Sequence, residues 1–145
     1  MIVYFKKLHS DAIAPSKSHT SDAGFDLTAL DSGTWDETYT YLEYRTGIAV
    51  EIPAGHVGLI FMRSSISKVN QILSNAVGVI DSGYRGEIKF RFRDTEEWGN
   101  QLKRYEKGDR IGQLIILPIP HIEMVESDNL SESDRGNGGF GSTGK

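Results

Sequence analysis

The sequence predicts an all-β protein, either a sandwich or a barrel. Several short stretches rich in β-branched and aromatic residues favour extended structure. Glycine, proline and aspartate turn signals separate these stretches. Only one short stretch favours a helix. Many short strands with a single helical turn are typical of antiparallel β architectures.

Six stretches are expected to form strands: 2–8, 46–52, 56–62, 76–80, 87–93 and 110–119. The turn signals fall at 53–55, 81–83, 99–100 and 108–109. Within the strands, 77–80 and 114–117 are almost wholly apolar, so we expect both to be buried on both faces. Residues 64–71 are expected to form one or two helical turns.

Length and composition limit the class of protein. The 145 residues suffice for one domain with a hydrophobic core. A net charge of −4 and a pI near 5.5 argue against a nucleic-acid partner. No cysteine is present, and the histidines lack metal-ligand spacing. No apolar run could cross a bilayer and the N-terminus does not resemble a signal peptide, so we expect a cytoplasmic protein with no membrane partner.

The chain is expected to divide at residue 122. Residues 1–122 form the β-barrel domain, and residues 123–145 form an acidic linker and a glycine-rich arm. A tail with five glycines in its last eleven residues should be mobile alone. Yet Arg135, Ser142 and Thr143 are donors that suit a polyphosphate, and the ring of Phe140 could stack on a nucleobase.

The stretch 75–86 contains the most pointed candidate site. An apolar strand leads into Asp81, which is well placed as a general base at the end of a rigid strand. Asn75 has both a donor and an acceptor for a base edge, the peptide groups of the hairpin could read the same edge, and Tyr84 could pack flat on a sugar. Taken alone, the stretch is better explained by a plain hairpin with a turn aspartate, because turn aspartates are common.

Three further segments carry weaker signals. At 63–68, Arg63 precedes the hydroxyls of Ser64 and Ser65, a combination that suits a phosphate but that an ordinary helix cap also explains. Gln113 lies in an apolar strand, and the partners that its amide needs could be structural. Asp26 lies beside a glycine turn and could simply lead into a strand.

Together and in this order, these segments resemble the five motifs of the homotrimeric dUTPases (deoxyuridine 5'-triphosphate nucleotidohydrolases). The resemblance extends from about residue 8 to residue 145. Its most specific parts are Gly-Val-Ile-Asp-Ser-Gly-Tyr-Arg-Gly-Glu at 78–87 and Arg-Gly-Asn-Gly-Gly-Phe-Gly-Ser-Thr-Gly at 135–144. It implies a distorted jelly-roll, or β-clip-like, fold with a flexible C-terminal arm. It also implies a homotrimer whose active sites lie at subunit interfaces and are closed by the arm.

The resemblance further implies a reaction and a role for each residue. The enzyme would hydrolyse dUTP to dUMP and pyrophosphate, which limits uracil incorporation into DNA and supplies dUMP for dTMP synthesis. Asp81 would be the catalytic base, and Mg²⁺ would be held mainly by the substrate phosphates, with Asp26 reaching it through water. The substrate would be bound by Arg63, Ser64, Ser65, Asn75, Gly78, Val79, Ile80, Tyr84, Gln113, Arg135, Phe140, Gly141, Ser142 and Thr143.

Three positions depart from the family pattern, and three other functions compete with it. Gly83 replaces a common acidic residue and is expected to loosen the hairpin turn, while Phe25 replaces a frequent Tyr and Gly112 a usual Ala. The alternatives are the related dCTP deaminase, a dUTPase-fold protein that regulates a protein partner, and a purely structural β domain. No insert between the motifs indicates a regulatory partner. A phage or viral source would place the enzyme in the host cytoplasm.

Overall fold

The computed structural model describes residues 1–95 and 103–139. In these residues it contains ten strands and one 3-10 helix, η1 (Ser64–Lys68). The strands, all paired antiparallel, are β1 (Tyr4–Lys7), β2 (Phe25–Thr28), β3 (Thr34–Asp36), β4 (Tyr41–Arg45), β5 (Ile48–Glu51), β6 (His56–Phe61), β7 (Gln71–Leu73), β8 (Gly78–Ile80), β9 (Lys89–Asp94) and β10 (Arg110–Pro118).

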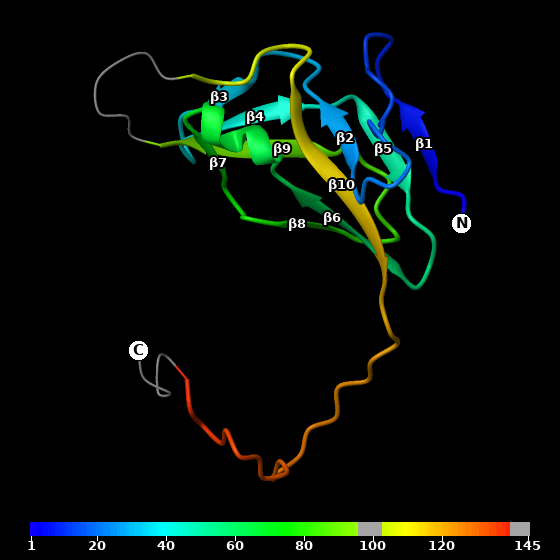
Figure 1. The fold of residues 1–145 in the computed structure, drawn as a ribbon, viewed down its shortest axis with the longest axis vertical. Helices are drawn as coiled ribbons and strands as arrows, with labels where there is room; N and C mark the ends of the chain where they lie inside the picture. Colours follow the sequence, from blue (N-terminus) through cyan, green and yellow to red (C-terminus); the bar gives the residue numbers. More distant parts are fainter. Residues whose placement is uncertain (96–102, 140–145) are drawn as a thin grey trace.

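The strands form two four-stranded sheets and a two-stranded one (Figure 1). The first sheet has the order β2-β10-β6-β8 and the second β3-β4-β9-β7, while β1 pairs with β5. Side chains of both large sheets form one buried cluster. It includes Leu27 and Leu114 from the first sheet and Tyr44, Phe90 and Phe92 from the second. The core therefore lies between the two sheets, as in a jelly roll.

Two buried tyrosines bring polar groups into this core. The Tyr44 hydroxyl donates to Oε1 of Gln71 at 3.1 Å, and the backbone N–H of Tyr105 donates to the same oxygen at 3.0 Å. The rings of Tyr44 and Phe92 meet edge to face, with centroids 5.7 Å apart. Aromatic packing and a shared acceptor thus connect β4, β7 and the segment before β10.

The all-β prediction is confirmed, and each of the six expected strands is present. Four strands were not predicted: β2, β3, β4 and β7. The helical turn is shorter than expected, because η1 ends at Lys68 and Gln71 already begins β7. A three-residue strand directly after a helical turn gives too short a pattern to recognise.

The prediction that 77–80 and 114–117 are buried on both faces is wrong for this chain. Val79 is 64% exposed and Leu117 is 44% exposed. Side chains alternate between the two faces of β8, and Val79 lies on the face that points away from the core. Leu117 lies near the end of β10, where the chain leaves the body.

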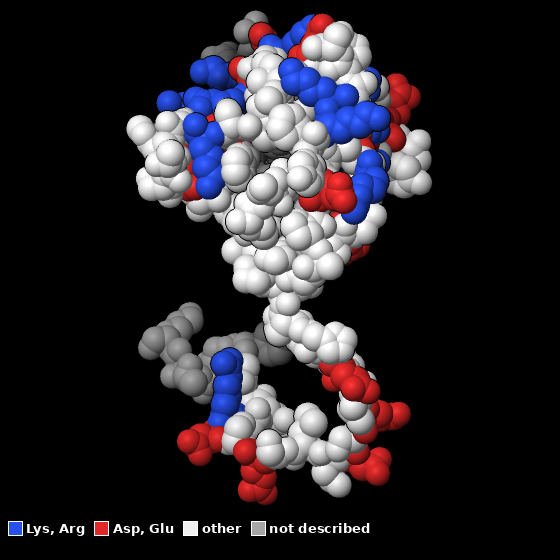
Figure 2. All heavy atoms as spheres, turned by 90° about the vertical axis from the view of Figure 1, so that its right-hand side faces the viewer, with Lys and Arg blue, Asp and Glu red and all other residues white. Residues whose placement is uncertain are grey.

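After β10 the chain runs away from the body (Figure 1). Residues 119–137 are all exposed and form neither helix nor strand. Acidic side chains follow this segment along its length (Figure 2), and they belong to Glu123, Glu126, Asp128, Glu132 and Asp134. In the part of the chain that the structure describes, no helix has the length and apolarity that a membrane span requires.

Candidate active site

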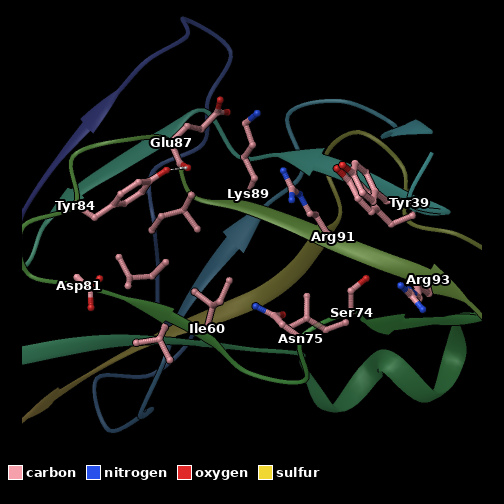
Figure 3. A pocket seen from close by; sticks show the side chains of 15 residues that line it. Tyr39, Ile60, Ser74, Asn75, Asp81, Tyr84, Glu87, Lys89, Arg91 and Arg93 are labelled. Atoms are coloured by element: carbon pink, nitrogen blue, oxygen red, sulfur yellow. Dashed lines mark hydrogen bonds between the residues drawn. The ribbon is translucent and has the colours of Figure 1, made fainter. Parts of the chain in front are cut away.

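A cavity of about 710 Å³ lies between the connection from β8 to β9 and the outer face of β9. Asp81 and Tyr84 lie at one end of it, and Tyr39 and Arg93 at the other, with Asn75 along one wall (Figure 3). The cavity is lined by Asp81, predicted as the catalytic base, and by four of the residues predicted to bind the substrate: Asn75, Val79, Ile80 and Tyr84.

The turn that carries Asp81 is tightly closed, but it is not the predicted hairpin, because β8 pairs with β6 and β9 pairs with β4 and β7 in the other sheet. The N–H of Tyr84 donates to the carbonyl of Asp81 at 3.0 Å. One nitrogen of Arg85, Nη1, donates to the carbonyls of Ser82 at 2.6 Å and of Tyr84 at 2.9 Å, and so bridges across Gly83. These bonds close the turn without an acidic side chain at position 83. Asp81 itself is exposed.

The side chain of Tyr84 folds back over the turn that follows β8. Its hydroxyl donates to the carbonyl of Glu87 at 3.0 Å (Figure 3). A Cβ built on Gly86 would lie 2.4 Å from that hydroxyl oxygen and 2.6 Å from Cζ of the ring. Only glycine at position 86 leaves room for this ring position. The ring is 44% exposed and can therefore contact a ligand.

The turn before β8 places Asn75 beside the strand that follows. Ala76 has a φ of +57°, in the left-handed region that side chains other than glycine rarely adopt. This strained residue reverses the chain so that Asn75 lies next to Gly78. Gly78 in turn packs on Ile60, where a Cβ would lie 2.3 Å from Cγ1. Close approach of β8 to β6 therefore requires glycine at position 78.

Sequence reasoning missed the basic wall of the cavity, formed by Lys89, Arg91 and Arg93. Lys89 Nζ lies 2.7 Å and Arg91 Nε 2.9 Å from the two carboxylate oxygens of Glu43. These hydrogen bonds raise the pKa values of Lys89 and Arg91. At Glu43, partial burial acts to raise the pKa, but the hydrogen bonds and charges of Lys89 and Arg91 together outweigh it, so the pKa is lowered. The sequence did contain a signal for this wall, the alternation Lys-Phe-Arg-Phe-Arg at 89–93. Its two phenylalanines face the core, so its three basic residues lie on the opposite face of the strand.

A second, smaller pocket of about 270 Å³ contains the residues predicted to contact phosphates. Asp26 Oδ1 accepts from Arg63 Nε at 2.8 Å, and Asp26 Oδ2 accepts from Arg110 Nη1 at 2.9 Å. Ser64 and Gln113 line the same pocket. The guanidinium of Arg63 has the planar fork that suits a phosphate, although two carboxylates, those of Asp22 and Asp26, line the same pocket.

Two neighbours of this pocket are explained by local contacts. Arg63 Nη1 donates to the Ser65 hydroxyl at 3.3 Å, so Ser65 supports the guanidinium. The amide of Gln113 donates to the carbonyl of Met62 at 3.1 Å and packs against Gly24, where a Cβ would lie 2.5 Å from Oε1. The residue before it, Gly112, lies against the ring of Phe90.

A metal ion was predicted to be held mainly by the substrate. In residues 1–95 and 103–139, no three His, Asp or Glu side chains converge into a metal site. An ion carried by phosphates needs no such cage. Each oxygen of Asp26 accepts one hydrogen bond from an arginine and retains a free lone pair, so a contact through water fits this carboxylate.

The structure brings the candidate residues together in two groups that do not join within one chain. The large cavity and the small pocket share none of their described lining residues. Arg135 lies in the exposed C-terminal segment, where its Nε donates to the carbonyl of Gly138 at 2.9 Å. The four remaining predicted residues lie outside the described residues: Phe140, Gly141, Ser142 and Thr143.

By its fold, the chain is an antiparallel β protein of the distorted jelly-roll class, with a cavity of about 710 Å³ beside the turn that follows β8. It belongs to the dUTPase family, whose family model matches residues 10–144. The deoxyuridine 5'-triphosphate nucleotidohydrolase of Tropheryma whipplei (strain Twist) is 38% identical over 139 residues, 95% of this chain and 93% of that protein. The protein of the same name from Clostridioides difficile is 39% identical over 140 residues, 96% of this chain and 95% of that protein.

A solved structure extends this likeness to three dimensions. The dUTPase of Staphylococcus bacteriophage 80alpha with dUPNHPP is 30% identical and matches with a TM-score of 0.79 over 99% of both chains. The family predicted from five short segments is therefore confirmed.

Proposed function

We propose that this chain is a dUTP diphosphatase that hydrolyses dUTP to dUMP and pyrophosphate. The observation that carries the proposal is the position of Asp81. Its carboxylate is exposed on a closed turn and lines the same cavity as Asn75 and Tyr84. Membership of the dUTPase family and the names of the curated relatives support the same reaction.

The strand β8 and the turns on either side of it would bind the nucleoside. Asn75 and the peptide groups of Gly78, Val79 and Ile80 would pair with the polar edge of uracil, which leaves unpaired groups against cytosine and so disfavours it. The ring of Tyr84 would lie against the deoxyribose and exclude a 2'-hydroxyl. Its hydrogen bond to Glu87 and its contact with Gly86 fix the ring for this role.

Asp81 would act as a general base. It would orient one water molecule and accept its proton while the oxygen attacks the α-phosphorus, and pyrophosphate would leave on the opposite side. A base of this kind contributes about 10²- to 10⁴-fold in rate. Positioning and charge neutralisation must supply most of the remaining acceleration.

The second pocket would hold the phosphates. Arg63 and Ser64 would contact phosphate oxygens, Ser65 would support the Arg63 guanidinium, and Gln113 would complete the wall. Bound Mg²⁺ would neutralise part of the phosphate charge, and Asp26 would orient a water of its shell.

Two separate pockets in one chain support a homotrimer. The nucleoside cavity of one copy and the phosphate pocket of a neighbour would face each other across an interface. Exposed apolar side chains on β8 and β10, such as Val79 and Leu117, would be covered there. Residues 123–145 would act as a linker and arm that reaches a site away from its own body, with Arg135 to Thr143 closing over the nucleotide. We place the enzyme in the cytoplasm, or in that of a host.

The experiment that tests this proposal is pyrophosphate release from dUTP, UTP, dTTP and dCTP with Mg²⁺, together with ammonia release from dCTP. Wild type should turn over dUTP selectively, and Asp81→Asn should reduce kcat by about 100-fold or more. Asp11→Asn is the matched control, because Asp11 is an exposed carboxylate that pairs with Lys107. Equal turnover by the Asp81 variant would remove Asp81 as the base, and ammonia release would favour a deaminase.

A further inference from the structure

The hydroxyl group of Tyr84 is linked to strand β5 through one peptide unit, that between Glu87 and Ile88. The carbonyl of Glu87 accepts from the Tyr84 hydroxyl at 3.0 Å. The N–H of the same peptide unit, which belongs to Ile88, donates to the carbonyl of Ile48 at 2.8 Å. Any rotation of this peptide would therefore move the tyrosine ring relative to β5.

The side chain of Glu87 fixes that peptide from a second direction. Its carboxylate points away from Tyr84 (Figure 3). Oε1 accepts from the N–H of Gly47 at 2.7 Å, and Oε2 accepts from Nε of Arg45 at 3.2 Å. Only 11% of the Glu87 side chain is exposed, so these charge-assisted bonds are poorly replaced by water.

The partner of Glu87 is a rigid part of the chain. Gly47 has a φ of +66°, and a Cβ on it would lie 2.8 Å from Cβ of Ala12. Its carbonyl accepts from the N–H of Leu8 at 2.8 Å. Next to it, the fully buried Thr46 donates from its hydroxyl to the carbonyl of Ile88 at 2.6 Å. The turn between β4 and β5 is thus held in place on several sides, and it can in turn hold the 87–88 peptide in position.

We infer that Glu87 is a positioning residue for Tyr84, and that it thereby sets the preference for 2'-deoxyribose over ribose. This inference rests on the proposed function. The carboxylate holds the 87–88 peptide against Gly47, the peptide holds the Tyr84 hydroxyl, and the ring keeps the tilt that leaves no room for a 2'-hydroxyl. Without the carboxylate the ring tilts more freely, and UTP gains access.

The test is the ratio of kcat/KM for dUTP to that for UTP. Glu87→Ala should lower this ratio about ten-fold, which corresponds to about 1.4 kcal/mol of discrimination. Glu87→Gln should keep most of the ratio, because its amide oxygen can still accept from Gly47. Glu106→Ala is the control, since it removes an exposed carboxylate that does not line the cavity.

A double-mutant cycle separates positioning from a general loss of structure. If Glu87 acts through the tyrosine hydroxyl, Tyr84→Phe and Glu87→Ala should not add in their effect on the ratio. An unchanged ratio in a folded Glu87→Ala protein, or fully additive effects, would overturn the inference. Should Glu87→Ala not fold, Glu87→Asp replaces it, because its shorter side chain falls short of Gly47 while the charge remains; a wild-type ratio in that variant would also overturn the inference.

Failure of this inference can be told apart from failure of the proposed function. Wild type that does not turn over dUTP, or that does not prefer it to UTP, contradicts the function itself. Wild type that prefers dUTP while the Glu87 variants keep the same preference contradicts only the role of Glu87.

Discussion

The ring of Phe90 occupies the space beside Gly112 that a side chain would need. A Cβ on Gly112 would lie 2.2 Å from Cε1 and 2.4 Å from Cζ of that ring, and 2.9 Å from the carbonyl oxygen of Phe61. Phe90 is fully buried between the two sheets. This contact explains why glycine stands where the family pattern usually has alanine: the larger core residue on β9 requires the smaller one on β10.

Gly112→Ala should therefore destabilise the protein by about 1–3 kcal/mol, the usual range for overpacking a filled core. Urea denaturation of the wild type and the variant measures this difference. Adding Phe90→Val should make the double variant more stable than the sum of the two single effects predicts, because the smaller valine makes room for the added methyl group and that methyl group fills part of the space left by the ring. Gly139→Ala is the control, since nothing lies within 4 Å of the added Cβ. Simple additivity would contradict the steric explanation.

Buried tyrosines should make the protein sensitive to alkaline pH. Burial raises the pKa values of Tyr44 and Tyr105, whereas both would ionise near 10.0 in the unfolded chain. The stability that these neutral side chains provide is therefore fully present below pH 10.0 and is lost as the pH rises toward their folded pKa values. Each tyrosine should lower the free energy of unfolding by about 1.4 kcal/mol per pH unit in that range.

Urea denaturation between pH 9 and pH 11, in steps of about half a pH unit, would measure how the free energy of unfolding changes with pH. Tyr44→Phe should make the alkaline decline less steep, and should cost about 1 kcal/mol at neutral pH because the hydrogen bond to Gln71 is lost. Tyr4→Phe serves as the matched control, because Tyr4 is 67% exposed. An equal alkaline slope in wild type and Tyr44→Phe would show that Tyr44 does not titrate on unfolding.

Much of the site could be predicted because its residues are close in sequence. Asn75, Asp81 and Tyr84 lie within ten residues of one another, in the turns before and after β8, and local turn signals suffice to bring them together. Glu43 and Lys89 lie on neighbouring strands but are 46 residues apart in sequence, and no local pattern connects them. The basic wall of the cavity therefore emerged only from the pairing of β4 with β9.

The four strands that sequence reasoning missed each have five residues or fewer. The strand β3 has three residues, and β4 alternates apolar side chains with Glu43 and Arg45, so neither gives a strong apolar signal. The error on 77–80 has a different origin. An apolar run indicates that its residues avoid water, but it does not indicate whether the same chain or another copy covers them.

The carboxylate of Asp26 offers a test of how the phosphate pocket works. Asp26→Asn removes the negative charge between Arg63 and Arg110 and leaves two guanidinium groups without their shared partner. We expect kcat/KM for dUTP to fall about ten-fold and the half-saturating Mg²⁺ concentration to rise, as for the loss of an outer-shell contact. A fall in kcat/KM with unchanged Mg²⁺ dependence would instead assign Asp26 to the arginines alone and contradict its contact with the metal shell.

A mixing experiment tests whether the arm of one copy serves the site of another. Residues 119–137 extend away from the body, which suits an arm that acts on a neighbour. Truncation after residue 134 and full-length Asp81→Asn should each be nearly inactive alone, since one lacks the arm and the other lacks the base. Refolded together in equal amounts, they should recover about a quarter of wild-type activity, because random assembly pairs an intact Asp81 with an intact arm at about one site in four.

The control mixes full-length Asp81→Asn with a truncated chain that also carries Asp81→Asn, and it should stay inactive. No recovery in the first mixture, with oligomers confirmed by light scattering, would mean that each arm serves its own chain or none.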